Sequence, residues 1–243
     1  MDSNHNIWDS LGKSSFNTHI GENQIDPRAA DNMLLAWPPI LDLIQSNYSP
    51  SKRIRVLDYG CGTGGFCTKL DLLGYSVVGI DSSEGMIETA INNSPSNIQY
   101  VLGNHTIVPS LGKFNIVVSI MTIQFIENAF EVMDHLNEAI VPGGLMILVD
   151  FNKTWVQESL RLRLWFENFD SIDSPTKGWK TFGEAKMPVY IREAKEYERI
   201  ANRMGLSKIL DVNPPFTNEF ITKYPDYIPN NVSEYQIIGY RKK

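Results

Sequence analysis

Short, nearly continuous apolar stretches alternate with amphipathic stretches over most of the chain. Five of the apolar stretches have the length of parallel strands, and residues 114–120 are typical of a strand that is buried on both faces of the sheet. Between them, apolar residues recur at three- and four-residue steps, which is typical of helices that cover a sheet. The predicted strands are residues 53–59, 76–81, 98–102, 114–120 and 141–150. Strands and helices that alternate in this way predict a doubly wound α/β fold.

The end of the chain regains this periodicity after a less regular segment. Residues 193–204 predict a helix that ends at Gly205. Residues 207–212 and 234–240 predict two closing strands, the last of them antiparallel. The complete sheet is then seven-stranded and mostly parallel, with helices on both faces.

Two segments depart from the alternation. Residues 1–26 are polar with isolated apolar side chains, which leaves open an unstructured tail or a lid that folds over a ligand. A helix then begins at Asp26-Pro27, and the Pro38-Pro39 pair is expected to kink or split it. Between residues 153 and 191 a short helical pattern gives way to glycines and prolines, which predict an irregular loop.

The first predicted strand runs directly into a glycine-rich turn, with glycine at positions 60, 62, 64 and 65, and a helix follows. Glycine permits positive φ and lets a ligand approach the backbone closely. The N-terminus of the helix points unpaired N–H groups, at the positive end of the helix dipole, toward that ligand. A negatively charged ligand group is therefore expected above the turn. A plain turn that binds nothing is the alternative.

Two classes of ligand fit these glycines. Gly60, Gly62 and Gly65 match the pattern of dinucleotide sites, whereas Gly60, Gly62 and Gly64 match that of S-adenosylmethionine sites. Asp58, at the tip of the strand, separates the two. Its carboxylate would repel a pyrophosphate by about 1 kcal/mol or more at an effective dielectric constant of about 20. The same carboxylate suits a ligand that carries an ammonium and a sulfonium group.

The stretch Asp58-Tyr-Gly-Cys-Gly-Thr-Gly64 resembles motif I of the class I S-adenosylmethionine-dependent methyltransferases, particularly the small-molecule branch with the ubiquinone- and menaquinone-type enzymes. Pro142-Gly-Gly144, before the fifth strand, is a further match, and the resemblance is close from about residue 54 to about residue 150. It implies a single domain over residues 1–243. Its expected parts are an N-terminal lid and helix (1–50), a cofactor-binding half (51–150), a substrate-pocket insertion (151–192) and a closing helix and strands (193–243).

Candidate cofactor-binding residues follow the tips of the predicted strands. Asp81 ends the second strand about 20 residues after the first glycine, where a ribose diol can donate to both carboxylate oxygens. A helix N-cap is its alternative role, because Ser82 and Ser83 begin the next helix. In the resembling family an acid or amide after the third strand bonds the adenine amino group, and Asn104 stands there. The predicted cofactor-binding residues are Asp58, Gly60, Cys61, Gly62, Gly64, Asp81, Ser82, Met86, Asn104, His105 and Ser119.

Catalytic groups are harder to assign. Where many members of the resembling family carry paired histidines after the fourth strand, this chain has Gln124 and Phe125. Glutamine can orient an acceptor but cannot serve as a base at neutral pH. His19, in the N-terminal segment, is the other weak candidate. The sequence therefore leaves the catalytic residues unknown.

No metal site is expected. The two cysteines, Cys61 and Cys67, lie across the glycine turn and form neither a disulfide framework nor a zinc motif. The four histidines are scattered along the chain. His135 lies on a predicted helix that is expected to bury Phe130 and Met133 and to leave the histidine exposed.

Charge and composition exclude further classes of function. The 243 residues carry a net charge of −6 and contain no basic run, so a nucleic-acid partner is not expected. We find neither a signal peptide nor an apolar run of about 18 residues, so a soluble, cytoplasmic protein without a membrane partner is expected. The chain is expected to be a monomer or a homodimer.

The resemblance implies methyl transfer from S-adenosylmethionine to a nitrogen or oxygen nucleophile of a small-molecule acceptor by in-line displacement, with S-adenosylhomocysteine as product. Aromatic residues of the insertion could line an apolar or cationic acceptor site, although a packing cap or a dimer contact fits them equally well. A nicotinamide-dependent oxidoreductase and a non-catalytic, S-adenosylmethionine-binding partner subunit are the alternative functions.

Overall fold

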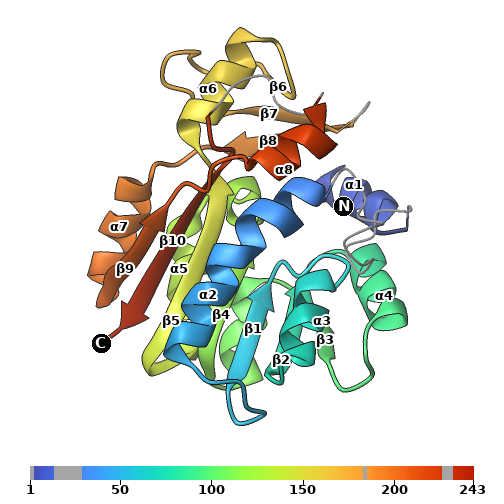
Figure 1. The fold of residues 1–243 in the computed structure, drawn as a ribbon, viewed down its shortest axis with the longest axis vertical. Helices are drawn as coiled ribbons and strands as arrows, with labels where there is room; N and C mark the ends of the chain where they lie inside the picture. Colours follow the sequence, from blue (N-terminus) through green and yellow to red (C-terminus); the bar gives the residue numbers. More distant parts are fainter. Residues whose placement is uncertain (1–2, 14–28, 183–184, 226–231) are drawn as a thin grey trace.

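The computed structural model describes residues 3–13, 29–182, 185–225 and 232–243. Its main sheet has seven strands in the order β3-β2-β1-β4-β5-β10-β9 (Figure 1). The strands are β1 (Arg55–Tyr59), β2 (Ser76–Asp81), β3 (Gln99–Leu102), β4 (Phe114–Ile120), β5 (Ile140–Phe151), β9 (Leu206–Val212) and β10 (Tyr235–Lys242). The first five strands pair in parallel, and β10 runs antiparallel to both of its neighbours. The predicted seven-stranded α/β fold is confirmed.

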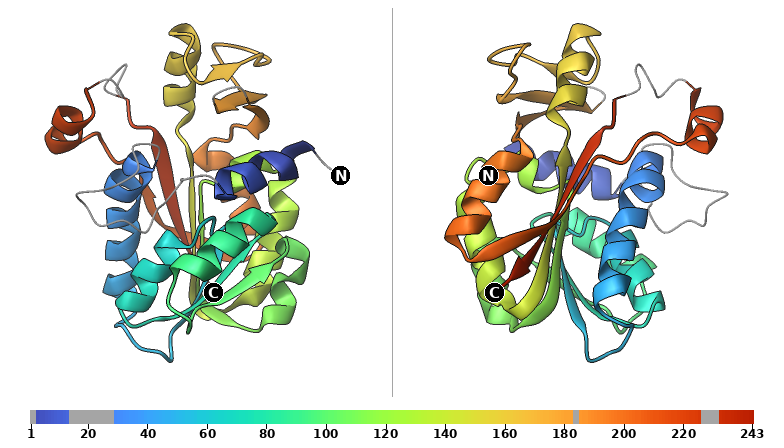
Figure 2. Two further views of the ribbon diagram at one scale, coloured as in Figure 1. Left: turned by 90° about the vertical axis from the view of Figure 1, so that its right-hand side faces the viewer. Right: turned by 60° about the vertical axis from the view of Figure 1, so that its left-hand side comes forward.

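Helices cover both faces of this sheet (Figure 2), because successive residues of a buried strand point to opposite faces. Val56 joins the core on one face and Leu57 the core on the other. The first face carries α2 (Trp37–Asn47), α3 (Gly65–Leu72) and α4 (Glu84–Asn93). The second carries α5 (Ala129–Ala139), α7 (Ala194–Arg203) and the 3₁₀ helix η3 (His105–Leu111).

One expectation about α5 is wrong. Its buried face includes Ala129, Val132 and Met133, so Phe130 points away from the sheet and is 43% exposed. The neighbouring expectation for His135 also needs correction, since this side chain is only half-exposed and lies against η3.

The N-terminal segment is helical where the structure describes it. α1 (Ser3–Lys13) lies against α4 (Figure 2). A π-helical turn, η2 (Asn32–Ala36), leads into α2, whose first residues include Pro38 and Pro39. The predicted interruption thus lies just before the proline pair, where proline cannot donate a helical hydrogen bond. The predicted helix start at Asp26-Pro27 lies outside the described residues.

The insertion after β5 is more regular than predicted. It contains α6 (Lys153–Arg161) and a small antiparallel sheet of β6 (Phe166–Glu167), β7 (Lys177–Phe182) and β8 (Ala185–Tyr190), which lies beyond the tips of the main sheet (Figure 1). Gly178 packs against the ring of Phe169, which a Cβ would overlap at 2.2 Å. Pro188 lies on β8, an edge strand, where a missing N–H costs little. The expectation of an irregular loop here was wrong.

A short helix, α8 (Asn218–Lys223), lies in the connection between β9 and β10 and buries Phe220 against the first-face core. Among the described residues, the structure contains no helix with the length and apolarity needed to cross a lipid bilayer.

Candidate cofactor site and acceptor pocket

The turn between β1 and α3 adopts the conformation that its glycines predicted. Gly60, Gly62 and Gly64 all have positive φ, at 76°, 55° and 84°. A Cβ at Gly60 would lie 2.0 Å from Oγ1 of Thr122, whereas a Cβ at Gly62 would meet nothing within 4 Å. Gly60 is therefore glycine because of close internal packing, and Gly62 leaves the backbone accessible from open space.

Helix α3 begins directly after this turn. Its N-cap is Gly64, and no side chain caps it. The first N–H groups of the helix thus keep their capacity to bind an anion such as a carboxylate.

Asp58 is buried beneath this turn and is only 2% exposed. Its Oδ2 accepts a hydrogen bond of 3.3 Å from Sγ of Cys67 on α3. Burial raises the pKa of the Asp58 carboxyl to about 7, the Cys67 bond opposes the rise and the nearby Asp81 adds to it. The sequence predicted that this carboxylate faces a cationic group of the ligand. In the structure, any selection for a cation has to act through a buried group that is ionised only in part at neutral pH.

Asp81, at the tip of β2, is bonded to the glycine turn. Its Oδ2 accepts from the N–H of Gly62 at 2.9 Å, and its Oδ1 accepts from the N–H of Ser83 at 2.9 Å. The N-cap of α4 is Ser83, whose Oγ accepts from the N–H of Met86. Asp81 therefore orients the turn and the start of α4, and its contact with a ribose remains a prediction.

The predicted adenine side has a different geometry from the expected one. Oδ1 of Asn104 already accepts from both N and Oγ1 of Thr106, at 3.0 and 2.7 Å, and so caps η3. His105 lies next to Glu131 of α5, with Nε2 3.6 Å from Oε1. Ser82 is exposed and Met86 is buried. The contacts predicted for these side chains remain predictions.

Cys61 and Ser119 are buried close to the same strand tips. Burial raises the pKa of the Cys61 thiol to about 11, which keeps it protonated at neutral pH. Oγ of Ser119, on β4, has no hydrogen-bond partner among the described residues. A buried hydroxyl without a partner is costly and marks a position where a ligand or water can bind.

The N-terminal helix α1 closes over the start of α4, which the sequence did not predict. Oδ1 of Asp9 accepts from Oγ of Ser83 at 2.6 Å and from the N–H of Gly85 at 3.1 Å. The two backbones approach so closely at Gly12 that a Cβ there would lie 2.5 Å from Gly85. The lid interpretation therefore fits the described part of the N-terminal segment. His19 lies outside the described residues.

An aromatic wall connects α1 to the insertion. The ring of Trp8 packs edge-on against Phe125 at 5.2 Å and against Phe182 at 5.7 Å between centroids. Beside it, an apolar hollow of about 380 Å³ is lined by Ile7, Ser10, Leu11, Phe182 and Ala185. Gln124 is fully buried behind this wall, and its Oε1 lacks a partner within the described part of the chain.

Lys180, on β7, is the one cationic side chain that we place in this wall. Its Nζ lies 4.8 Å from the ring centre of Phe166, 5.0 Å from that of Phe151 and 5.3 Å from that of Phe182. Burial lowers the pKa of its ammonium group, while the charges of Glu234 and Asp31 oppose this change. Sequence reasoning missed Lys180 because β7 was taken for a loop.

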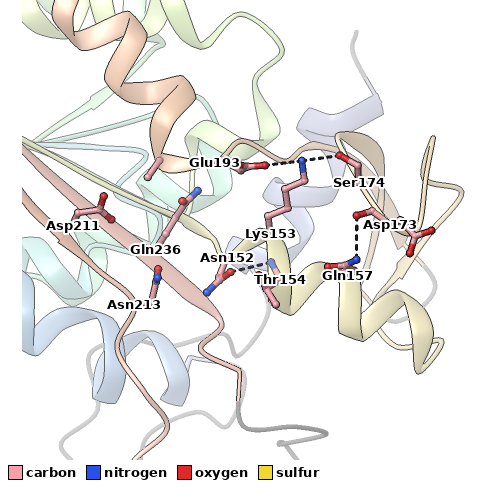
Figure 3. A pocket seen from close by; sticks show the side chains of 11 residues that line it. Asn152, Lys153, Thr154, Gln157, Asp173, Ser174, Glu193, Asp211, Asn213 and Gln236 are labelled. Atoms are coloured by element: carbon pink, nitrogen blue, oxygen red, sulfur yellow. Dashed lines mark hydrogen bonds and ion pairs between the residues drawn. The ribbon is translucent and has the colours of Figure 1, made fainter.

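A second hollow, of about 390 Å³, is lined by residues of α6, α7, β9 and β10 and of the loops beside them (Figure 3). Its polar groups bond mainly to one another: Lys153 Nζ donates to Glu193 and Ser174, each at 3.1 Å. None of the predicted cofactor-binding residues lines it. It is therefore separate from the site at the glycine turn.

Comparisons with known proteins agree with this geometry. A family model described as a methyltransferase domain matches residues 28–209. Ubiquinone biosynthesis O-methyltransferases are similar: that of Rickettsia bellii is 29% identical over 118 residues, covering 47% of this chain and 49% of the relative. That of Mesorhizobium japonicum is 26% identical over 178 residues, covering 68% and 72%. The chain thus spans about half the length of the first of these relatives.

Solved structures share the fold. A putative S-adenosylmethionine-dependent methyltransferase from Listeria monocytogenes superposes with a TM-score of 0.69 at 17% identity, covering 89% of this chain and 98% of that one. A magnesium protoporphyrin IX methyltransferase from Synechocystis, solved with S-adenosylhomocysteine, has a TM-score of 0.61 at 17% identity, covering 99% and 100%.

Proposed function

The chain belongs to the family of methyltransferase domains, and we propose that it transfers the methyl group of S-adenosylmethionine to an anionic oxygen of a small, largely apolar acceptor. Membership of this family confirms the resemblance that the sequence showed to the class I methyltransferases. These enzymes use S-adenosylmethionine as cofactor. The nucleophile, the acceptor and the in-line route are parts of the proposal.

The main observation that supports this proposal is the open turn at Gly62. It offers backbone that a ligand can reach, next to a helix start without a side-chain cap. Asp81 fixes the turn from the neighbouring strand through Oδ2, while its Oδ1 accepts from the N–H of Ser83. An amino acid carboxylate above α3 and a ribose at Asp81 satisfy these groups with a single ligand. Asp58, beneath the turn, contributes negative charge toward the ligand ammonium once it is ionised.

Three features support an anionic oxygen in an apolar acceptor. The hollow beside Phe182 is lined mostly by apolar side chains, and Trp8 and Phe125 extend that surface. Lys180 adds a positive charge that can pair with a carboxylate or lower the pKa of a phenol. The two ubiquinone biosynthesis relatives named above are O-methyltransferases.

Such an acceptor needs little help with protons. Bound S-adenosylmethionine supplies a methyl group on a positively charged sulfur; the acceptor oxygen forms a C–O bond as the C–S bond breaks, and the bonding pair stays on sulfur. An oxygen that is already ionised releases no proton, so Gln124 is not required to act as a base. The residues of the pocket contribute by holding the oxygen in line, about 3–3.5 Å from the methyl carbon. α1 and the aromatic wall exclude water from that contact.

Turnover of a labelled methyl group tests this function. The full chain is incubated with S-adenosylmethionine and a panel of aromatic acceptors that carry a phenol, a carboxylate or an amine on the same ring. We expect transfer to the phenol or the carboxylate. Transfer to the amine alone would contradict the oxygen assignment, and tight cofactor binding without turnover on any acceptor would favour the non-catalytic partner subunit.

A further inference from the structure

We propose that His105, Glu131 and His135 form a binding site for a divalent transition metal of the zinc type. A ring nitrogen of each histidine and a carboxylate oxygen of Glu131 all lie within 4.8 Å of one another. The two imidazole rings are 5.2 Å apart between centroids. No motif spacing in the sequence indicates this site, because η3 and α5 bring its residues together from distant positions.

The fold already orients two of the three side chains. Glu131 and His135 are four residues apart on α5 and so share one face of the helix. Nδ1 of His135 lies 3.0 Å from the backbone oxygen of Glu131. Because a carbonyl oxygen can only accept, Nδ1 carries the proton, and Nε2 of the neutral ring keeps its lone pair for a metal.

The carboxylate is held in a similar way. Nδ2 of Asn128 donates to Oε2 of Glu131 at 3.0 Å, which leaves Oε1 on the side of His105. Such outer contacts, from a carbonyl to an imidazole and from an amide to a carboxylate, are typical of metal ligands. His105 stands at the start of η3, so a metal would connect η3 directly to α5.

The set of donors selects the class of metal. Two imidazoles and one carboxylate suit Zn²⁺ and neighbouring transition metals, whereas Mg²⁺ and Ca²⁺ prefer oxygen ligands. Zinc binds such ligands at about 2.0–2.2 Å, which places tetrahedral donor atoms about 3.3 Å apart. The donor atoms, which lie within 4.8 Å of one another, therefore need to approach by up to about 1.5 Å, to which rotation of the exposed Glu131 can contribute. Three protein ligands leave a fourth position for water.

Titration of the metal-free full chain with Zn²⁺, in competition with a chromophoric chelator, tests the site. We expect one zinc per chain, with no displacement by a large excess of Mg²⁺. His135→Ala and Glu131→Gln are each expected to weaken binding by at least about tenfold, the scale of a lost ligand. Glu138→Gln, an exposed glutamate on the same helix, is the matched control and is expected to bind normally.

Two outcomes would overturn the proposal. One is the absence of stoichiometric zinc binding by a folded chain, with folding checked by circular dichroism. The other is unchanged binding in His135→Ala, or loss of binding in a His5→Ala/His19→Ala double variant, which would assign the zinc to the N-terminal histidines.

Discussion

Replacing Asp58 by asparagine is expected to stabilise the ligand-free protein above neutral pH. The folded chain has to hold this carboxylate in a site where it is 2% exposed and where its pKa is raised from 3.8 to about 7. Between these two values the unfolded chain has released the proton and the folded chain still binds it. Stability therefore falls as pH rises through this window, and the loss is complete above about pH 7.

The magnitude follows from the shift. About three pKa units correspond to about 4 kcal/mol at 1.36 kcal/mol per unit. Asparagine has the same shape and carries no charge, and its Oδ1 can still accept from Cys67. Its amide N–H groups gain no assured partner, which costs about 1–3 kcal/mol. The net expectation at pH 8 is a gain in stability of about 1–3 kcal/mol.

Urea unfolding of wild type and Asp58→Asn at pH 4.5, 6 and 8 measures this difference. We expect it to grow with pH and to be smallest at pH 4.5, where the folded wild type is protonated. Asp150, whose pKa burial also raises to about 7, affects both proteins equally and cancels in the comparison. A variant that is less stable than wild type at pH 8, or a difference independent of pH, would refute the reasoning. Affinity for S-adenosylmethionine at pH 8 is expected to fall about tenfold or more in the variant, because a charged partner of the ligand ammonium is lost.

Three further substitutions separate the parts of the proposed site. Gly62→Ala should weaken S-adenosylmethionine binding at least tenfold in calorimetry but cost only about 1–2 kcal/mol of stability; Gly143→Ala, with positive φ and equally open surroundings, should show the same strain without the binding loss. Asp9→Ala should detach α1 from α4 and lower the affinity for S-adenosylmethionine. The detachment is measured as faster proteolysis near the N-terminus. Lys180→Met should raise KM for an anionic acceptor at least tenfold and leave cofactor affinity unchanged. Equal losses of S-adenosylmethionine affinity in both glycine variants would count against ligand approach at Gly62. An N-terminus that resists proteolysis in Asp9→Ala would count against the attachment of α1 by Asp9. An unchanged KM in Lys180→Met would count against acceptor binding by Lys180.

The main sheet could be predicted from the sequence because its central strands are buried on both faces. Residues 76–81 and 114–120 are largely apolar, and both strands form with these bounds. The glycine turn could be predicted as well, because few residues other than glycine adopt the positive φ found at Gly60, Gly62 and Gly64.

The insertion could not be predicted because its order depends on distant contacts. Gly178 and Pro188 break local patterns, yet they lie in paired strands that pack on Phe151 and Trp155. Local propensity carries no information about that aromatic cluster.

Only the part of the candidate site at the strand tips could be predicted from the sequence. The bond from Ser83 to Asp9 joins residues 74 positions apart, and the histidine–glutamate cluster joins η3 to α5. At Asn104 a local contact went unpredicted. The amide of Asn104 was predicted to face a ligand, but its Oδ1 already accepts hydrogen bonds from Thr106 in a local turn. The assignments of individual cofactor contacts, the division of the chain and its oligomeric state remain predictions.

A calorimetric titration of the full chain with S-adenosylhomocysteine and, separately, with NAD examines the glycine turn most directly. We expect one S-adenosylhomocysteine per chain, no binding of NAD, and a loss of at least about 1 kcal/mol in the folded Asp81→Ala variant, the scale of a lost charged hydrogen bond. Binding of NAD in place of S-adenosylhomocysteine, or an affinity unchanged by Asp81→Ala, would contradict the placement of the nucleoside at this turn.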